Sequence, residues 1–278
     1  MTRADIRDPA IAWPSCTLGG WAAAWVAGTC SPDDVISALT DTAGLHLIVD
    51  AGAVTADTGD GALGLLTLLR GARSLAVRLP HAGDVNGLPP DPATTAAFAS
   101  GEVLLVDDGR SGGPLALVPE VSGSTHTGHT DDLICRWTVL RYGRDLDLGA
   151  LVSGGPSVGE LEYQLRQAVR DAAEVIARLG GTRAAVTADL RDQLAVRTVA
   201  HRVLLPPHPR DDRPNRIIDT AARIDAIVDL ATAYAVTPGD SARQVDSGDT
   251  ELRRLRALTR NARAAAVNSV IGELLPTG

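Results

Sequence analysis

The clearest absence in this chain is lysine: all 26 basic residues among its 278 are arginine. Without a lysine amine the chain forms no Schiff base, which excludes pyridoxal-phosphate enzymes and Schiff-base aldolases. The standard Walker A phosphate loop and the phosphate-pairing lysine of protein kinases are excluded for the same reason. One missing residue type therefore removes several large enzyme classes.

Aromatic residues are also scarce, and the chain has no excess of positive charge. Aromatics make up 3% of the chain, and the formal net charge is −8. Residues 1–200 carry 15 arginines against 24 acidic residues, and residues 201–278 carry 11 against 10, so neither part is strongly basic. Proteins that bind nucleic acids need a basic surface, and those that bind single strands also need aromatic stacking platforms. We therefore expect no nucleic-acid partner.

Cysteines are few, and no long apolar run is present. Cys16, Cys30 and Cys135 form no CxxC pair, which indicates neither a disulfide framework nor a four-thiolate zinc site. The first ten residues, MTRADIRDPA, contain early acids and no apolar core, so they are not a signal peptide. The uncharged residues 9–32 are interrupted by Pro, Gly, Ser and Thr, which argues against a membrane span. We expect a cytoplasmic protein that does not contact a membrane.

The first half of the chain alternates helices and strands and then continues with adjacent strands. Ser31 and Asp91, each followed by proline, are typical helix N-caps. Apolar periodicity predicts helices over residues 17–28, 31–39, 60–72 and 91–100, and strands over 45–51, 74–80, 101–109, 113–121 and 133–143. This order predicts a mixed sheet with helices on at least one face.

The pattern changes after residue 147. The Gly- and Ser-rich stretch 148–159 resembles a linker, and residues 157–181 then show apolar positions at helical spacing, ended by a glycine pair. Further helices are predicted over 183–200, 215–234 and 249–274, with a proline-rich break over 204–215. The predicted fold class is α+β. An N-terminal mixed β-sheet with helices, residues 1–147, is followed by a helical C-terminal region, residues 157–278, packed on it.

One stretch resembles known proteins. The run LAVRLPHAGDVNGLPPDPATTAAFASGEVLLV (75–106), followed by LALVPEV, is similar to a group of uncharacterised actinobacterial proteins. In these, a strand leads into a Gly-Asp…Gly-Leu-Pro loop, an alanine-rich helix and a strand that begins with Gly-Glu. No activity is assigned to that group, so the resemblance implies no functional residue.

The stretch HTGHTDD, residues 126–132, contains two histidines three positions apart and two aspartates. A zinc site is conceivable, but zinc needs three or four ligands that are held rigidly. The flanking segments are predicted strands, and the connecting residues are Ser, Thr, Gly, His and Asp, which is the composition of a turn. We interpret the stretch as the tip of a hairpin, with zinc binding by His126 and His129 as the alternative.

Two aspartates, Asp50 and Asp107, each end a predicted strand. In an open parallel sheet, ligands collect at the carboxyl ends of the strands. If these two strands are adjacent and parallel, the two carboxylates would lie near each other and hold Mg²⁺. Aspartate is also a common turn former, and we favour that interpretation. We therefore expect no metal and no cofactor.

His81 and Asp84 lie in a long loop punctuated by glycine and proline, residues 79–92. Such loops often carry function, and His81 is a candidate general base that Asp84 would orient. A rigid structural loop is the interpretation that we favour.

Near the C-terminus, a stripe of arginines borders an apolar helix face: Arg253, Arg256, Arg260 and Arg263. Their side chains would cover the edge of the core, or would contact the acidic half of the chain or a partner.

No H-E-x-x-H motif is present. The G-x-S-x-G pattern occurs at residues 109–113 and 155–159, and the G-x-G-x-x-G pattern at residues 59–64, but none of these joins a predicted strand directly to a predicted helix, as a serine elbow or a dinucleotide-binding turn does. The favoured hypothesis is a non-catalytic interaction or regulatory protein that acts through a protein partner or through self-association. The alternative is a Mg²⁺-dependent enzyme that acts on a phosphorylated small molecule. In that case Asp50 and Asp107 would bind the metal, and an arginine would bind the phosphate. Whether the protein is an enzyme stays open at this stage.

Overall fold

The computed structural model describes residues 13–50, 61–110, 112–123, 132–180, 184–207, 212–234 and 242–275. Its centre is a mixed sheet of β1 (Leu45–Asp50), β2 (Ser74–Arg78), β3 (Val103–Asp107), β4 (Leu115–Ser122) and β5 (Ile134–Arg141), in the order β1-β5-β4-β3-β2. β1 pairs with β5 in parallel, and the other pairs are antiparallel. The predicted α+β class is confirmed.

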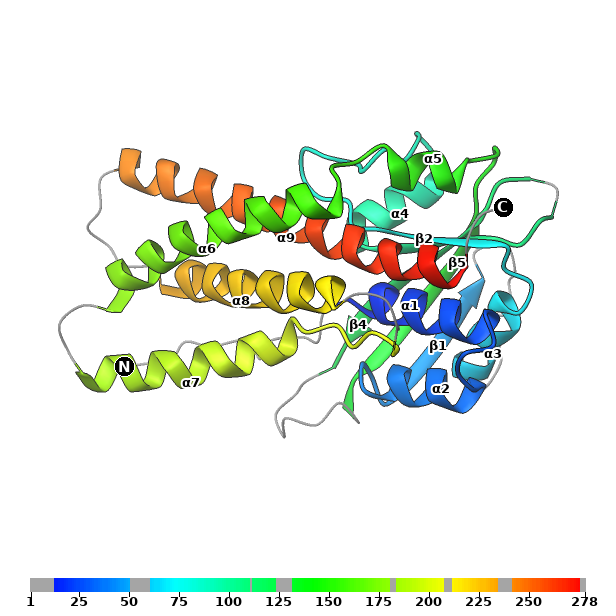
Figure 1. The fold of residues 1–278 in the computed structure, drawn as a ribbon, viewed down its shortest axis with the longest axis horizontal. Helices are drawn as coiled ribbons and strands as arrows, with labels where there is room; N and C mark the ends of the chain where they lie inside the picture. The colour runs from blue at the N-terminus through cyan, green and yellow to red at the C-terminus, as the bar shows by residue number, and fades with distance from the viewer. Residues whose placement is uncertain are drawn as a thin grey trace.

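Helices cover both faces of this sheet (Figure 1). The larger cluster of buried side chains joins the sheet to α1 (Pro14–Val26), α2 (Pro32–Thr40), α3 (Gly61–Leu69) and the end of α9 (Ala242–Leu274). A smaller cluster on the opposite face joins it to α4 (Pro92–Ser100) and α5 (Leu148–Ser153). Within β3, Leu104 belongs to the larger cluster and Leu105 to the smaller one. This explains why β3 is almost continuously apolar, because both of its faces are covered.

The helical region extends past the sheet. It consists of α6 (Val158–Gly180), α7 (Ala184–Ala200), α8 (Arg213–Tyr234) and the first part of α9. Figure 1 shows these helices side by side, pointing away from the strands. α8 packs against α6, α7 and α9, while α9 continues to the sheet and contacts α1 and β2. The C-terminal helices therefore meet the N-terminal sheet through α9.

Helix starts follow the signals in the sequence. The Ser31 hydroxyl accepts a hydrogen bond from the Asp34 backbone N–H, and the Asp34 carboxylate accepts one from the Ser31 N–H, which completes a capping box. Asp91 caps α4 through the Ala93 N–H. The prediction of a linker over 148–159 is wrong for its first half. There the Asp147 carboxylate accepts from the Ala150 N–H at 2.9 Å, and α5 begins with a buried Leu148.

α9 covers the outer edge of β2. The Asn268 side chain accepts a hydrogen bond from the Val77 N–H at 2.8 Å and donates one to the Val77 carbonyl at 3.0 Å. An amide group here satisfies both main-chain groups of one edge residue, as a neighbouring strand would. Among the described residues, no helix is both long enough and apolar enough to cross a membrane.

Candidate functional site

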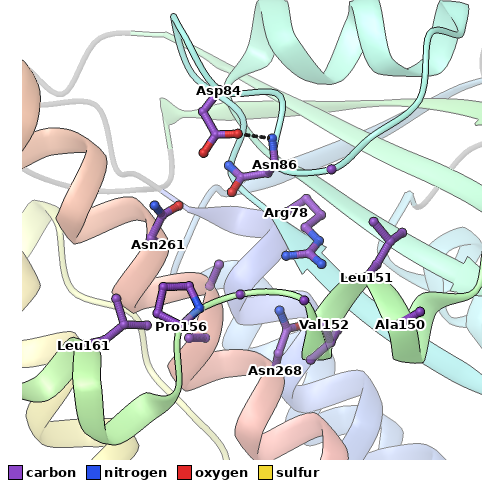
Figure 2. Close-up of a pocket in the computed structure, with 15 residues that line it drawn as sticks. Arg78, Asp84, Asn86, Ala150, Leu151, Val152, Pro156, Leu161, Asn261 and Asn268 are labelled. Carbon is purple, nitrogen blue, oxygen red and sulfur yellow. Dashed lines mark hydrogen bonds between the residues drawn. The ribbon is translucent and has the colours of Figure 1, made fainter.

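A half-open cavity of about 380 Å³ lies where β2, the loop after it, α5 and α9 meet. It is called the Arg78 pocket below. Figure 2 shows Arg78 between Asn86 and Asn268, with Asp84 on the same side as Asn86. The volume is within the range of roughly 300–1,000 Å³ that is typical of small-molecule sites. The described lining residues are Arg78, Asp84, Asn86, Gly87, Ala150, Leu151, Val152, Gly154, Gly155, Pro156, Leu161, Asn261, Ala264, Ala265 and Asn268.

Arg78 is the last residue of β2 and is only 9% exposed. Within the described part of the chain, no hydrogen bond or ion pair reaches its guanidinium, and its Nε–H is buried without an acceptor. Burial lowers the pKa of Arg78, an effect that nearby Asp84 partly offsets. Arginine nevertheless stays charged at neutral pH. The pocket therefore contains a positive charge that the fold does not neutralise by direct contact.

Asp84 and Asn86 reach the pocket from a tight turn. The main-chain groups of His81 and Asp84 exchange two hydrogen bonds of 2.9 Å, which closes the turn, and Gly83 within it has φ +93°. Asp84 Oδ1 accepts from the Asn86 N–H at 2.7 Å. Asn86 has φ +54° and donates through its side chain to the Leu79 carbonyl at 2.7 Å. Asparagine tolerates that left-handed backbone better than most residues, so the sequence fixes this turn locally.

His81 and Asp84 contact each other through main-chain hydrogen bonds, and their side chains have other partners. His81 Nδ1 lies 3.0 Å from the Ala82 carbonyl. A carbonyl only accepts, so Nδ1 carries the proton in that contact. His81 is not among the residues that line the pocket, whereas Asp84 is. The role of His81 as a base remains a prediction, and no contact seen here shows the Asp84 carboxylate orienting its imidazole.

Asp50 and Asp107 do not come together. β1 and β3 run in the same direction, but β5 and β4 lie between them, which places the two strands three strand spacings, roughly 14 Å, apart. The condition for a shared Mg²⁺ site, adjacent strands, is therefore not met. Asp107 Oδ1 accepts from the Gly109 N–H at 2.8 Å, which is the geometry of a turn-forming aspartate.

No group of three or more potential metal ligands is found among the residues that the structure describes. His126 and His129 lie outside those residues, so the structure does not place them. Their flanks are placed: β4 and β5 pair antiparallel from Leu115 opposite Arg141 to Ser122 opposite Ile134. The stretch HTGHTDD therefore lies in the connection of two adjacent antiparallel strands, as the sequence predicted.

None of the three cysteine thiols is activated. Cys16 and Cys135 are fully buried, and burial raises the pKa of each thiol far above its usual range. Burial, together with Asp34, also raises the pKa of Cys30. Because the thiolate is the reactive form, these residues are unsuited to act as nucleophiles.

Within the arginine stripe of α9, Arg253 and Arg256 are exposed, whereas Arg260 and Arg263 are more deeply buried than the sequence indicated. Arg263 is completely buried and donates to Asp225 at 2.8 Å. Arg260 donates to the Gly101 carbonyl at 2.7 Å, and its guanidinium lies 4.8 Å from the ring centroid of Trp13. Arg260 and Arg263 therefore hold α9 against the N-terminal half and against α8, and Arg78 is the one cationic side chain among the described residues that line the pocket.

Sequence reasoning missed Arg78. The available signal was a charged residue that ends an otherwise apolar strand, SLAVRLP. Such a charge is costly to bury unless something pairs with it.

Comparisons with known proteins agree with the resemblance seen in residues 75–106. The model of the Rv1486c-like protein, N-terminal domain, matches residues 15–147, and that of the C-terminal domain matches residues 159–264. The uncharacterized protein Rv1486c of Mycobacterium tuberculosis H37Rv is 32% identical, over 95% of this chain and 99% of its own length. The uncharacterized protein ML1804 of Mycobacterium leprae is 31% identical over the same shares. No solved structure matches. On these matches, the chain belongs to the Rv1486c-like family.

Proposed function

We propose that this protein is a non-catalytic interaction protein of the cytoplasm that binds a small anionic molecule in the Arg78 pocket. One observation carries the proposal: Arg78 is 9% exposed, faces a cavity of about 380 Å³ and has no hydrogen-bond or ion-pair partner among the described residues. Burying a charge without a partner costs several kcal/mol, so such a charge is best explained by a ligand that pairs with it. The planar guanidinium suits carboxylate and phosphate groups, which it binds with two parallel hydrogen bonds.

The chemistry of the lining supports binding without catalysis. The described lining residues include no serine, threonine, cysteine, histidine or tyrosine, and Asp84 is their single carboxylate. Amide side chains donate and accept hydrogen bonds but do not transfer protons at neutral pH. The alternative, a Mg²⁺-dependent enzyme built on Asp50 and Asp107, has no observation in its favour, since β1 and β3 are not neighbours.

A second copy of this chain is the protein partner that we propose. Val196 and Val199 on α7 are 60% and 72% exposed, and Tyr163 on α6 is 67% exposed. α7 also presents Arg191 and Asp192, both exposed, so its outer face combines apolar side chains with charges of both signs. A face of that kind is self-complementary, which a symmetric pair of copies requires.

The binding proposal is tested with Arg78→Met, which removes the charge and keeps much of the side-chain volume. Thermal unfolding is followed with rising acetate, 4-methylpentanoate or inorganic phosphate. At least one of these anions should stabilise the wild-type protein, by about 2.7 kcal/mol at a hundredfold excess over its dissociation constant. Arg78→Met should abolish that stabilisation.

Arg136→Met, which changes an exposed arginine of β5, is the matched control and should respond like the wild type. Without ligand, Arg78→Met should be as stable as the wild type or more stable, because an unpaired buried charge has been removed. A large loss of stability in Arg78→Met, with no response of the wild type to any anion, would show that Arg78 is structural.

A further inference from the structure

The Arg78 pocket contains charges of both signs that do not pair with each other. Asp84 lies close enough to influence the pKa of Arg78, yet the two side chains form no ion pair within 4.0 Å. Asp84 Oδ1 is occupied by the Asn86 N–H, while its other carboxylate oxygen has no hydrogen bond among the described residues. Figure 2 shows Asn86 between the side chains of Asp84 and Arg78. Each charge is thus open to a ligand group of the opposite sign.

The rest of the pocket lining combines apolar side chains with side-chain amide groups. Leu151, Val152, Pro156 and Leu161 come from α5, the loop after it and the start of α6. Asn261 and the small residues Ala264 and Ala265 come from α9. A ligand that fits has a short aliphatic part, and amides near its polar ends can accept or donate hydrogen bonds.

Electrostatics determines which charges the polar ends of the ligand carry. A ligand with an anionic group alone would pair with Arg78 but would place a second negative charge in a small cavity that already contains Asp84, which disfavours both charges. A ligand with a cationic group alone would have the reverse problem at Arg78. A molecule that carries one charge of each sign neutralises both side chains.

We infer that the ligand is a small zwitterion of the amino-acid class with an aliphatic body, whose carboxylate pairs with Arg78 and whose ammonium group pairs with Asp84. This inference rests on the proposed function and specifies its ligand. The hydrogen bonds formed are charge-assisted at both ends, which is the stronger kind. No covalent step is involved.

The test uses zwitterions and their deaminated partners on the full-length protein. The pairs are leucine with 4-methylpentanoate and 5-aminopentanoate with pentanoate, measured by calorimetric titration. At least one zwitterion should bind the wild-type protein about tenfold or more tightly than the acid that lacks its amine, equivalent to about 1.4 kcal/mol. This comparison needs no variant, so it stands even if a substitution disturbs the turn.

Asp84→Asn keeps an oxygen that can accept from the Asn86 N–H. This variant should bind the zwitterion only as tightly as it binds the plain acid. It should bind the plain acid more tightly than the wild type does, because the repulsion between the Asp84 carboxylate and the acid is removed. Asp145→Asn, an exposed aspartate outside the pocket, is the matched control and should change neither. If plain acids bind as tightly as the zwitterions, the ligand assignment fails while the anion-binding function stands. If neither class binds, both fail.

Discussion

At the scale of single residues, Glu102 shows how one carboxyl links the first helix to the sheet. It precedes β3, is 8% exposed, and accepts hydrogen bonds from the Ser15 N–H and hydroxyl in the first turn of α1. Burial raises the pKa of Glu102 above its ordinary value of 4.5, although the Ser15 hydrogen bonds and the nearby arginines Arg260 and Arg263 act in the opposite direction. The folded protein therefore holds this proton more tightly than the unfolded chain does.

The sign of the pH effect follows from that difference. Above pH 4.5 the unfolded chain loses the proton first, so each further rise in pH favours unfolding until the raised folded-state pKa is passed. Glu102→Gln removes this titration and keeps an oxygen for Ser15. We expect the wild-type free energy of unfolding to fall relative to that of Glu102→Gln as pH rises from 4.5 toward neutrality. Urea unfolding at a series of pH values measures this, with Glu120→Gln, an exposed glutamate of β4, as the control. A wild-type protein that gains stability over the variant with rising pH would contradict it.

At the scale of elements, the pairing of β4 with β5 indicates whether the two histidines between these strands are needed to form the hairpin. Eight residues of each strand pair in register, so the hairpin has enough main-chain hydrogen bonding to form without a metal. We expect the double substitution His126→Ala with His129→Ala to change the free energy of unfolding by no more than about 0.5 kcal/mol. Added zinc should raise the melting temperature of the parent protein no more than that of the double variant. A zinc-dependent rise that the double variant loses would favour the metal interpretation.

α7 is the element on which self-association is tested. Val196→Glu with Val199→Glu places two negative charges on the exposed face of α7, where a second copy would bring the same charges close. Light scattering after size exclusion should give the mass of a dimer for the concentrated wild-type protein and of a monomer for the double variant. Leu63→Glu, at a 52% exposed position of α3, is the control and should remain dimeric. A wild-type protein that stays monomeric at all concentrations would contradict the proposed self-association.

At the scale of the whole molecule, the sequence predicted the elements better than their contacts. All five strands described here were expected from apolar runs, because a strand covered on both faces has a strong local signature. The order β1-β5-β4-β3-β2 was not predictable in this way, since strand order depends on contacts between distant segments. For the same reason, the sequence left open whether the strands of Asp50 and Asp107 are adjacent, which the structure shows they are not. Arg78 was missed because its isolation is a property of its surroundings: only the assembled pocket shows that no partner reaches it.

The contact between Asn268 and β2 has a consequence for how the chain is made. Val77 and Asn268 are 191 positions apart, so β2 emerges from the ribosome long before the residue that closes its outer edge. An uncovered strand edge is a template for pairing with other chains, and domains generally fold as synthesis proceeds. During that interval the nascent sheet has an open edge. A messenger truncated before the last turns of α9 would therefore yield a product whose characteristic fault is aggregation along β2.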